Sequence, residues 1–342
     1  MKSAMNRNFV LTATVLALSL AWMGCNKSGK LGKKSEFKTP TGPIELKLKW
    51  PLHERVVQVM DMKMKMETAI PGQPAPMKTE MTMGESFGQT VLQANSDGTH
   101  EVELDFLSAR LAVTQPGRPT MEFDSEKKAT ADKPNPLADV FGKIIGAKVQ
   151  YFLDASNAVE RIEGVDALIA RLATGTKADA AAPFKSMFSE GYFKQMMSAN
   201  QFMPPNAVKP GDTWPVRMEF PMATMGIMVM AYDVTFQNWE MHGQRNCARM
   251  EFTGNIQTKP DPNAKPGGMT ISIQEGNTTG ISWFDPELGI TIDTQMNQDL
   301  KMVIQVPMPQ RAKPGTKPPA PKMQSITNQM NQVMNIKLES VK

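Results

Sequence analysis

Residues 56–67 read VVQVMDMKMKME, and this stretch decides the fold class. Successive side chains of an extended strand point to opposite faces, so a period of two separates one face from the other. One parity of the stretch carries Met60, Met62, Met64 and Met66, and the other carries Asp61, Lys63, Lys65 and Glu67. The pattern predicts a long strand that buries a methionine face and turns a charged face to solvent.

The alternation recurs in the residues that follow. Met77, Met81 and Met83 share one parity of the next run, and Asp97-Gly98 favours a two-residue hairpin turn. In the return strand the apolar parity changes between Phe106 and Leu107, which indicates a β-bulge. Runs of about 12 residues at ~3.3 Å each reach ~40 Å, so these strands are expected to curl around something.

A second group of strands is expected after residue 206. One parity carries Met228, Met230, Tyr232, Val234 and Phe236. The sequence Gln-Met-Asn-Gln occurs at 295–298 and again at 329–332. Two copies indicate paired neighbouring strands rather than a solenoid, which needs at least three repeats.

The pattern changes to a helical one between about residues 136 and 197. A short helix is expected at Pro136–Ile145, and two more where apolar residues fall at helical spacing: Val165, Leu168, Ile169 and Leu172, then Phe184, Phe188, Tyr192 and Met196. Such helices bury their stripes on a sheet or across its open end. The fold class predicted is α+β and mostly β, with long antiparallel strands curled into a half barrel or clam and a helical insert packed on or across it.

The composition limits the class of protein. The chain has 342 residues, of which 21% are charged, and a formal net charge of +4. These values argue against a multi-span membrane protein and a wholly disordered chain, and they give no global basic surface for nucleic acid. The 29 methionines outnumber the 15 Phe, 5 Trp and 3 Tyr together, which predicts an interior rich in flexible side chains.

The amino terminus has the layout of a secretory signal. Lys2 and Arg7 precede an apolar run from Phe9 to Leu20, which is too short to span a bilayer comfortably. Gly24-Cys25 resembles the end of a bacterial lipobox, although Trp22 and Met23 depart from its usual residues. The resemblance implies that Cys25 is acylated and becomes the first residue. The alternatives are a plain secretory signal or an uncleaved anchor.

The expected organisation follows from these patterns. Residues 1–24 form a lipoprotein signal peptide, and residues 25–43 form a flexible, lysine-containing tether. Residues 44–206 contain the first long-stranded sheet and the helical insert. Residues 207–342 supply further antiparallel strands of the same fold, with an exposed proline-rich excursion at 307–322.

The methionine-rich parity is the candidate functional face. We expect it to be the wall of a site for a hydrophobic ligand, made by Met60, Met62, Met64, Met66, Met81, Met83, Met228 and Met230. The alternatives are a filled core in a structural or interaction lipoprotein, and a Cu(I) site built from thioethers. Residues two apart on a strand are ~6.6 Å apart, so copper would need methionines from a second strand.

No catalytic constellation stands out. Gly84-Glu85-Ser86-Phe87-Gly88 satisfies GxSxG, but the residues after it favour a strand, whereas a nucleophile elbow needs a helix there. A Ser86 hydrolase is therefore a remote alternative. Cys247 is expected to be a structural thiol within a strand. Neither a metal nor a cofactor is expected, and the function predicted is non-enzymatic.

Four sequence patterns resemble a family of uncharacterised secreted bacterial lipoproteins across most of residues 44–342. They are Phe123-Asp124-Ser125, Tyr151-Phe152-Leu153-Asp154, Val159-x-x-Ile162-x-Gly164-x-Asp166-x-Leu168, and Val208-Lys-Pro-Gly-Asp-Thr-Trp214. The family brings no known activity, so it supplies no catalytic residues. The curled sheet with helices across its opening is also similar in architecture to open-barrel carriers of envelope lipids and lipoproteins.

These observations predict the location and the partners. The lipid anchor would hold the protein on a membrane of the bacterial cell envelope, and Asn26 after the cysteine favours the outer membrane, facing the periplasm. The expected partners are that membrane and either a hydrophobic small molecule or an apolar segment of an envelope protein. Nucleic acid is not expected.

Overall fold

The computed structural model describes residues 35–127, 136–174, 190–197, 199–221, 226–260, 269–308 and 322–342. The expected fold class is confirmed, since the described residues are mostly β, with 63% strand and 9% helix. The predicted signal peptide, Cys25 and the first part of the predicted tether lie outside the described residues.

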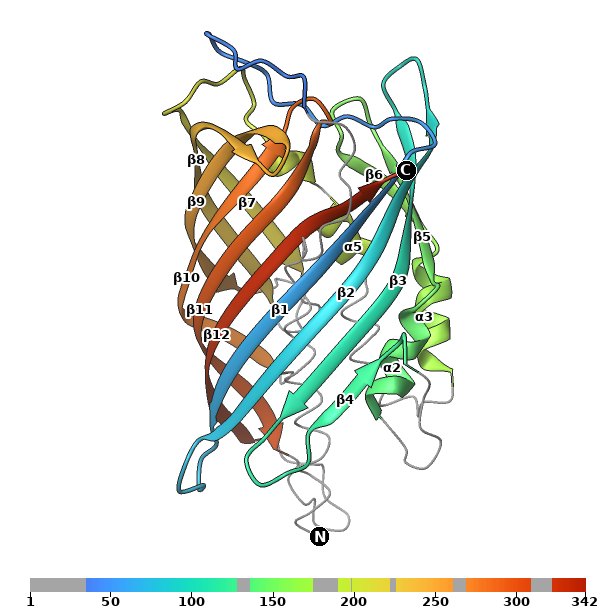
Figure 1. The fold of residues 1–342 in the computed structure, drawn as a ribbon. Coiled ribbons are helices and arrows are strands. Elements are labelled where there is room, and N and C mark those ends of the chain that lie inside the picture. Colours follow the sequence, from blue (N-terminus) through green and yellow to red (C-terminus); the bar gives the residue numbers. More distant parts are fainter. Residues whose placement is uncertain are drawn as a thin grey trace.

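Twelve strands form one antiparallel sheet. They are β1 (Arg55–Ala69), β2 (Met77–Ala94), β3 (His100–Thr114), β4 (Met121–Asp124), β5 (Lys148–Leu153), β6 (Val159–Glu163), β7 (Thr213–Pro221), β8 (Ile227–His242), β9 (Arg245–Lys259), β10 (Thr270–Asp285), β11 (Ile290–Met308) and β12 (Lys322–Val341). Their order is β6-β5-β3-β2-β1-β12-β11-β10-β9-β8-β7, and β4 pairs with β3 off this path. The first and last long strands are therefore neighbours (Figure 1).

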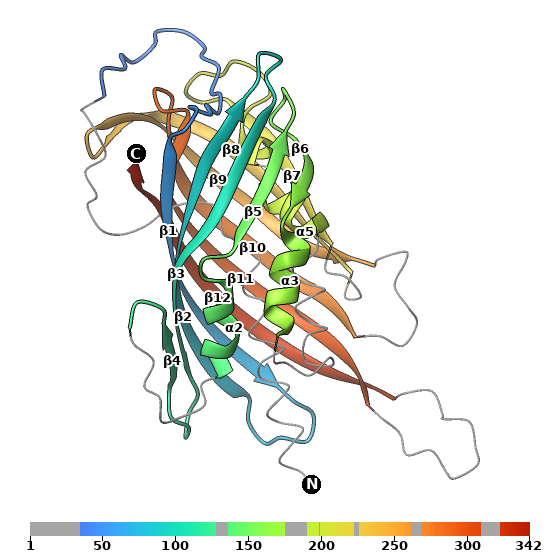
Figure 2. The ribbon, with the colours of Figure 1, turned by 90° about the vertical axis from the view of Figure 1, so that its right-hand side faces the viewer.

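The sheet curls but does not close. Its two edges are β6 and β7, and the helices lie along the open side between them (Figure 2). These helices are α2 (Pro136–Ile144), α3 (Val165–Ala173), α5 (Glu190–Met197) and the 3-10 helix η2 (Ala199–Phe202). Helix α5 contacts both β6 and β7, so it bridges the two edges of the sheet. This arrangement is the half barrel with a helical insert that the sequence predicts.

Several local predictions can be compared with the register. Phe87 pairs with Phe106 and Ser86 with Ser108, which leaves Leu107 as the extra, exposed residue of the predicted bulge. The two Gln-Met-Asn-Gln copies lie on β11 and β12, where Gln298 pairs with Gln332. Both the bulge and the pairing of neighbouring strands are confirmed.

Two boundaries differ from the predictions. The loop after β2 spans residues 95–99, and only Gly98 in it has positive φ, so the connection is longer than a two-residue turn. Strand β11 continues through Pro307, which pairs with Met323, because proline can occupy a strand end where little pairing remains to be lost. Residues 309–321 of the proline-rich segment, and Phe184 and Phe188 of the third helical stripe, lie outside the described residues.

One end of the half barrel is crossed by the segment before β1. Ile44 forms a β-bridge with Val208, and the Lys49 amide donates to the Gly289 carbonyl at 3.1 Å. The Trp50 indole donates to Asn157 Oδ1 at 2.6 Å. These contacts join residues 44–50 to the segment before β7, the β10–β11 turn and the β5–β6 turn. Residues 44–50 therefore connect three parts of this end of the half barrel. We call this segment the strap.

The core lies on the concave side of the sheet and is continuous from β1 to the helices. Leu46 of the strap is buried in it, as are Leu168 of α3 and Phe193 of α5. No helix in the described part of the chain has the length and apolar character needed to cross a membrane.

Candidate functional site: the inner wall of the curled sheet

Strand β1 separates its two faces as the alternation predicts. Met60, Met62, Met64 and Met66 are all buried on the concave side, whereas Lys63 and Lys65 are exposed. The same holds for Met81 and Met83 of β2 and for Met228 and Met230 of β8. All eight predicted wall residues therefore lie on the inner face. Their role in binding stays a prediction.

Strand pairing gathers methionines from separate parts of the chain. Met62 pairs with Met83 on one side and with Met334 on the other, and Met334 pairs with Met296. Paired side chains on one face of an antiparallel sheet are neighbours, with Cβ atoms ~5 Å apart. Four adjacent strands thus contribute one row of thioethers. Sequence reasoning missed Met296 and Met334, because register cannot be derived from alternation.

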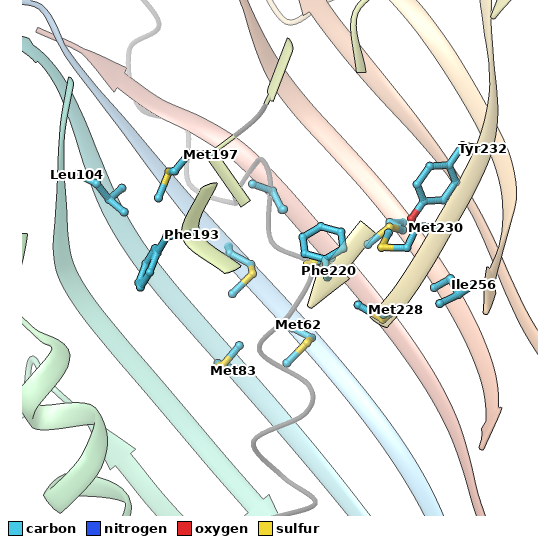
Figure 3. Packing of buried hydrophobic residues seen from close by; sticks show 14 of the residues in the cluster. Met62, Met83, Leu104, Phe193, Met197, Phe220, Met228, Met230, Tyr232 and Ile256 are labelled. Carbon is cyan, nitrogen blue, oxygen red and sulfur yellow. The ribbon is translucent and has the colours of Figure 1, made fainter. Parts of the chain in front are cut away.

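The opposite side of the interior is made by β7, β8 and β9. Met228, Met230 and Tyr232 of β8 and Ile256 of β9 face inward, across from Met62 and Met83 (Figure 3). Phe193 and Met197 of α5 project into the same interior (Figure 3). Phe193 and Met197 are buried there, whereas the side chains of the predicted stripe residues Tyr192 and Met196 are not among those that the structure describes.

A row of polar side chains crosses the inner wall, and the sequence analysis did not identify it. Gln332 of β12 pairs with Gln298 of β11, and Gln298 pairs in turn with Thr278 of β10. These side chains are 2%, 1% and 1% exposed. The next position in the row is Gly254 of β9, and Tyr232 of β8 follows it. We call Gln332, Gln298, Thr278 and Tyr232 the polar row.

Two oxygens of the polar row, Gln298 Oε1 and Thr278 Oγ1, lack a partner of strict hydrogen-bond geometry. Burial raises the pKa of the Tyr232 hydroxyl, and a side-chain hydrogen bond with Thr278, looser than that geometry, acts in the opposite direction. The amide of Gln298 has only a weak acceptor, the sulfur of Met296 at 3.9 Å.

One carboxyl lies on the inner wall. Glu85 has the inner parity of β2 and pairs with Met60 and Ala109. Burial raises the pKa of its carboxyl from 4.5 to about 7. The residue as a whole has intermediate accessibility.

The GxSxG pentapeptide lies inside β2 rather than at the end of a strand. Ser86 pairs with Val59 on one side and Ser108 on the other, and β2 continues to Ala94. A nucleophile elbow needs a sharp turn into a helix after the serine. This local geometry lacks that turn.

The two glycines of the pentapeptide have a packing role instead. Each lets an arginine cross β2 and pair with an aspartate two strands away: Arg110 passes over Gly84 to Asp61, and Arg55 passes over Gly88 to Asp105. Both ion pairs lie on the outer face, opposite the inner wall. They connect β1 and β3 across the strand between them.

The remaining candidate groups lie away from the inner wall. Cys247 is fully buried within β9, and burial raises the pKa of its thiol, as expected of a structural cysteine. Within the described residues, no three or more His, Cys, Asp or Glu side chains are grouped to hold a metal ion. A Cu(I) site built from methionines stays a prediction.

Two pockets are defined by described residues. A groove of about 610 Å³ lies beside β4 and is lined mainly by charged outer-face residues such as Asp61, Lys63 and Arg110. A cavity of about 30 Å³ lies beneath the strap, between Leu48, Trp50, Gln58 and Gln89. The groove has the size of a ligand site, but its mixed charges do not suit an apolar ligand.

These features define a class of fold: an open, curled β-sheet with an apolar inner wall and a helix that bridges its two edges. This chain belongs to a family of unknown function, DUF6263, which matches residues 97–291, more than half of the chain. The matched residues include all four patterns on which the sequence resemblance rests. No curated protein sequence matches the chain.

Solved structures with similar folds are distant. A lipovitellin structure on lipid–protein interactions is 8% identical with a TM-score of 0.44, covering 86% of this chain but 26% of that one. A Bacteroides fragilis protein with a YmcC-like fold is 11% identical with a TM-score of 0.26, covering 87% and 100%. A Vibrio parahaemolyticus domain named for outer membrane lipoprotein sorting is 11% identical with a TM-score of 0.16, covering 84% of each chain. These scores are too low to carry an argument about function.

Proposed function

We propose that this chain is a non-enzymatic lipoprotein of the bacterial cell envelope that binds an acyl chain along the inner wall of its curled sheet. The observation that carries the proposal is the continuity of that wall. Alternate residues of β1, β2, β8, β9, β11 and β12 point into one interior, and most of them are apolar and flexible. Methionine side chains adapt to irregular apolar partners, which suits a mobile hydrocarbon chain.

The width of the enclosure supports a ligand site. In closed barrels, about eight strands give an interior that side chains just fill, or that holds one small ligand. Here eleven strands follow one another along the sheet, and α5 bridges its two edges. The larger strand number favours a wider interior than that of an eight-stranded barrel.

The anchoring part of the proposal rests on the sequence. The basic, apolar and small segments before Cys25 have the order of a lipoprotein signal. Acyl chains on that cysteine would add ~0.8 kcal/mol of membrane affinity per buried CH₂. Residue 26 is Asn, which favours the outer membrane. The tether would then hold the half barrel near a membrane that contains the proposed ligand.

Native mass spectrometry of the full chain, released from detergent after purification from the envelope, tests both parts. The expected spectrum shows a chain that begins at an acylated Cys25 and carries a further, non-covalent acyl lipid. A spectrum without bound lipid, also after incubation with excess oleate and monooleoylglycerol, would contradict ligand binding. An unmodified Cys25 would contradict the anchor alone.

A pair of adjacent variants on β1 locates the ligand. Met62→Trp fills space at the inner wall and is expected to reduce bound lipid at least several-fold. Lys63→Trp adds the same side chain to the outer face and should leave the bound lipid unchanged. Equal effects of the two substitutions would place the lipid elsewhere. Circular dichroism of both variants checks that the sheet forms.

A further inference from the structure

Buried polar side chains interrupt the apolar inner wall at several points, among them Gln58, Thr68, Asn328 and the polar row. The neighbours of the polar row along β11 are Met296 and Leu300, and those along β12 are Met330 and Met334, which are buried or partly buried apolar residues. Gln298 and Thr278 are each only 1% exposed. A buried polar group that lacks its hydrogen bond costs ~1–3 kcal/mol. In the polar row, Gln298 Oε1 has no such bond and Thr278 Oγ1 has only a loose one with Tyr232.

The backbone around the polar row leaves space for it. Gly254 stands between Thr278 and Tyr232 in the row, and the Tyr232 ring occupies the volume that a side chain at residue 254 would take. The tyrosine hydroxyl is thereby brought towards Thr278. The polar groups thus form a continuous line across β12, β11, β10 and β8 rather than isolated sites.

The polar row contains no charge. Within the described residues, the inner-parity positions of β8 to β12 that flank it carry no Asp, Glu, Lys or Arg: 228–236, 250–256, 276–282, 294–304 and 326–338 in steps of two. An ionised head group would be buried there without an opposite charge, which is costly. A hydroxyl both donates and accepts hydrogen bonds, so it satisfies Gln298 in either orientation of the amide.

We infer that the polar row recognises the head group of the ligand, and that this head group is uncharged and carries hydroxyls, as in an acylglycerol or a long-chain alcohol. This inference rests on the proposed function and specifies its ligand class. The acyl chain lies along the methionine-rich wall, and the hydroxyls bind Gln298 Oε1 and Thr278 Oγ1. Carboxylate and phosphate head groups are disfavoured.

Three ligands with one oleoyl chain test the inference. The full chain is incubated with equal concentrations of monooleoylglycerol, oleate or methyl oleate, and bound ligand is measured by native mass spectrometry. We expect monooleoylglycerol to bind about tenfold more tightly than methyl oleate, which lacks a hydroxyl, and more tightly than oleate. Equal binding of all three, or preference for oleate, overturns the head-group assignment and leaves the proposed function standing. No binding of any of them overturns the proposed function itself.

The residues are tested with a combined variant, Thr278→Val with Gln298→Leu. It is expected to bind monooleoylglycerol and methyl oleate equally, with the affinity for methyl oleate unchanged. Asn297→Leu, at the neighbouring exposed position of β11, should keep the tenfold preference. The thermal midpoint of the combined variant should be unchanged or higher, because it removes unsatisfied polar groups. A persistent preference in this folded variant would contradict the assignment.

Discussion

Glu85 shows how a single side chain couples the inner wall to pH. Its carboxyl projects from the inner face of β2 beside Met60, and burial raises its pKa to about 7. The neutral acid is therefore the favoured form between pH ~4.5 and ~7, where an exposed glutamate is ionised. The strand keeps this residue in an apolar setting although Glu80, on the outer face of the same strand, lies in solvent.

This pKa shift predicts how stability depends on pH. Below pH ~4.5 both the folded and unfolded states bind the proton, and no penalty arises. Between pH ~4.5 and ~7 the unfolded state releases it while the folded state keeps it, so the free energy of unfolding falls by about 3 kcal/mol. Above that range the loss is constant. Guanidinium unfolding of Glu85→Gln should show a smaller decrease from pH 4.5 to 7.5 than the unmodified protein.

Glu80→Gln is the control for that measurement, because its side chain is 65% exposed. It should leave the pH dependence nearly unchanged. If Glu85→Gln follows the same pH profile as the unmodified protein, the carboxyl at residue 85 is solvated, and its pKa is not raised by burial.

Glycine positions distinguish the two faces of the sheet. At Gly254 a Cβ would lie within 3.0 Å of the Ala231 carbonyl oxygen and of Tyr232, whose backbone cannot move without breaking the β8–β9 pairing. At Gly84 a Cβ would meet only the Arg110 side chain, which is 63% exposed and can move away. The two glycines are alike in sequence but not in what surrounds them.

Alanine substitutions should therefore separate the two glycines. Gly254→Ala is expected to lower the free energy of unfolding by more than ~2 kcal/mol, and Gly84→Ala by less than ~1 kcal/mol, since only an exposed ion pair is disturbed. Denaturant unfolding of both variants at one pH makes the comparison. Equal losses would mean that Tyr232 does not occupy the space over Gly254.

At the scale of elements, α5 completes the enclosure. It contacts β6 and β7, which are the two edges of the sheet, and Phe193 faces the interior. An uncovered edge strand presents unpaired backbone groups to other chains. The helix thus covers apolar surface and two edges at once.

Phe193→Ala tests this role of α5. The loss of a fully buried phenylalanine is expected to cost ~3–5 kcal/mol and to expose the edges of the sheet, which raises light scattering on heating. Lys194→Ala, which removes an exposed ion pair with Glu190, should cost less than ~0.5 kcal/mol. Similar melting curves for the two variants would show that α5 is not needed to hold the sheet together.

The strands themselves could be predicted from alternation, because period two is a local property. This is why Met60 to Met66 were assigned to the inner face and Leu107 to a bulge. Register is not local, since it depends on which strands meet. The pairing of β1 with β12, the row from Met83 to Met296 and the polar row could therefore not be derived. The repeated Gln-Met-Asn-Gln was the one sequence signal that pointed to the polar row.

At the scale of the whole molecule, the interior of the curled sheet is covered at one end and along its open side. The strap crosses one end through Ile44, Lys49 and Trp50, and α5 covers the open side. The outer face carries ion pairs between strands, such as the pair of Asp61 on β1 with Arg110 on β3. The chain thus presents a charged exterior and an apolar interior, which suits a protein that holds a lipid at a membrane surface.

Photocrosslinking tests directly whether the inner wall binds a hydrocarbon chain. The reagent is a long-chain alcohol that carries a diazirine along its hydrocarbon chain. The reagent is added to the full chain, and the labelled residues are identified by mass spectrometry of peptides. The account predicts labels at inner positions of β1, β2, β8, β11 and β12, such as Met62, Met83 and Met296, and none at Lys63 or Asn297. Labels confined to outer-face residues, or no label above that of a denatured control, would contradict it.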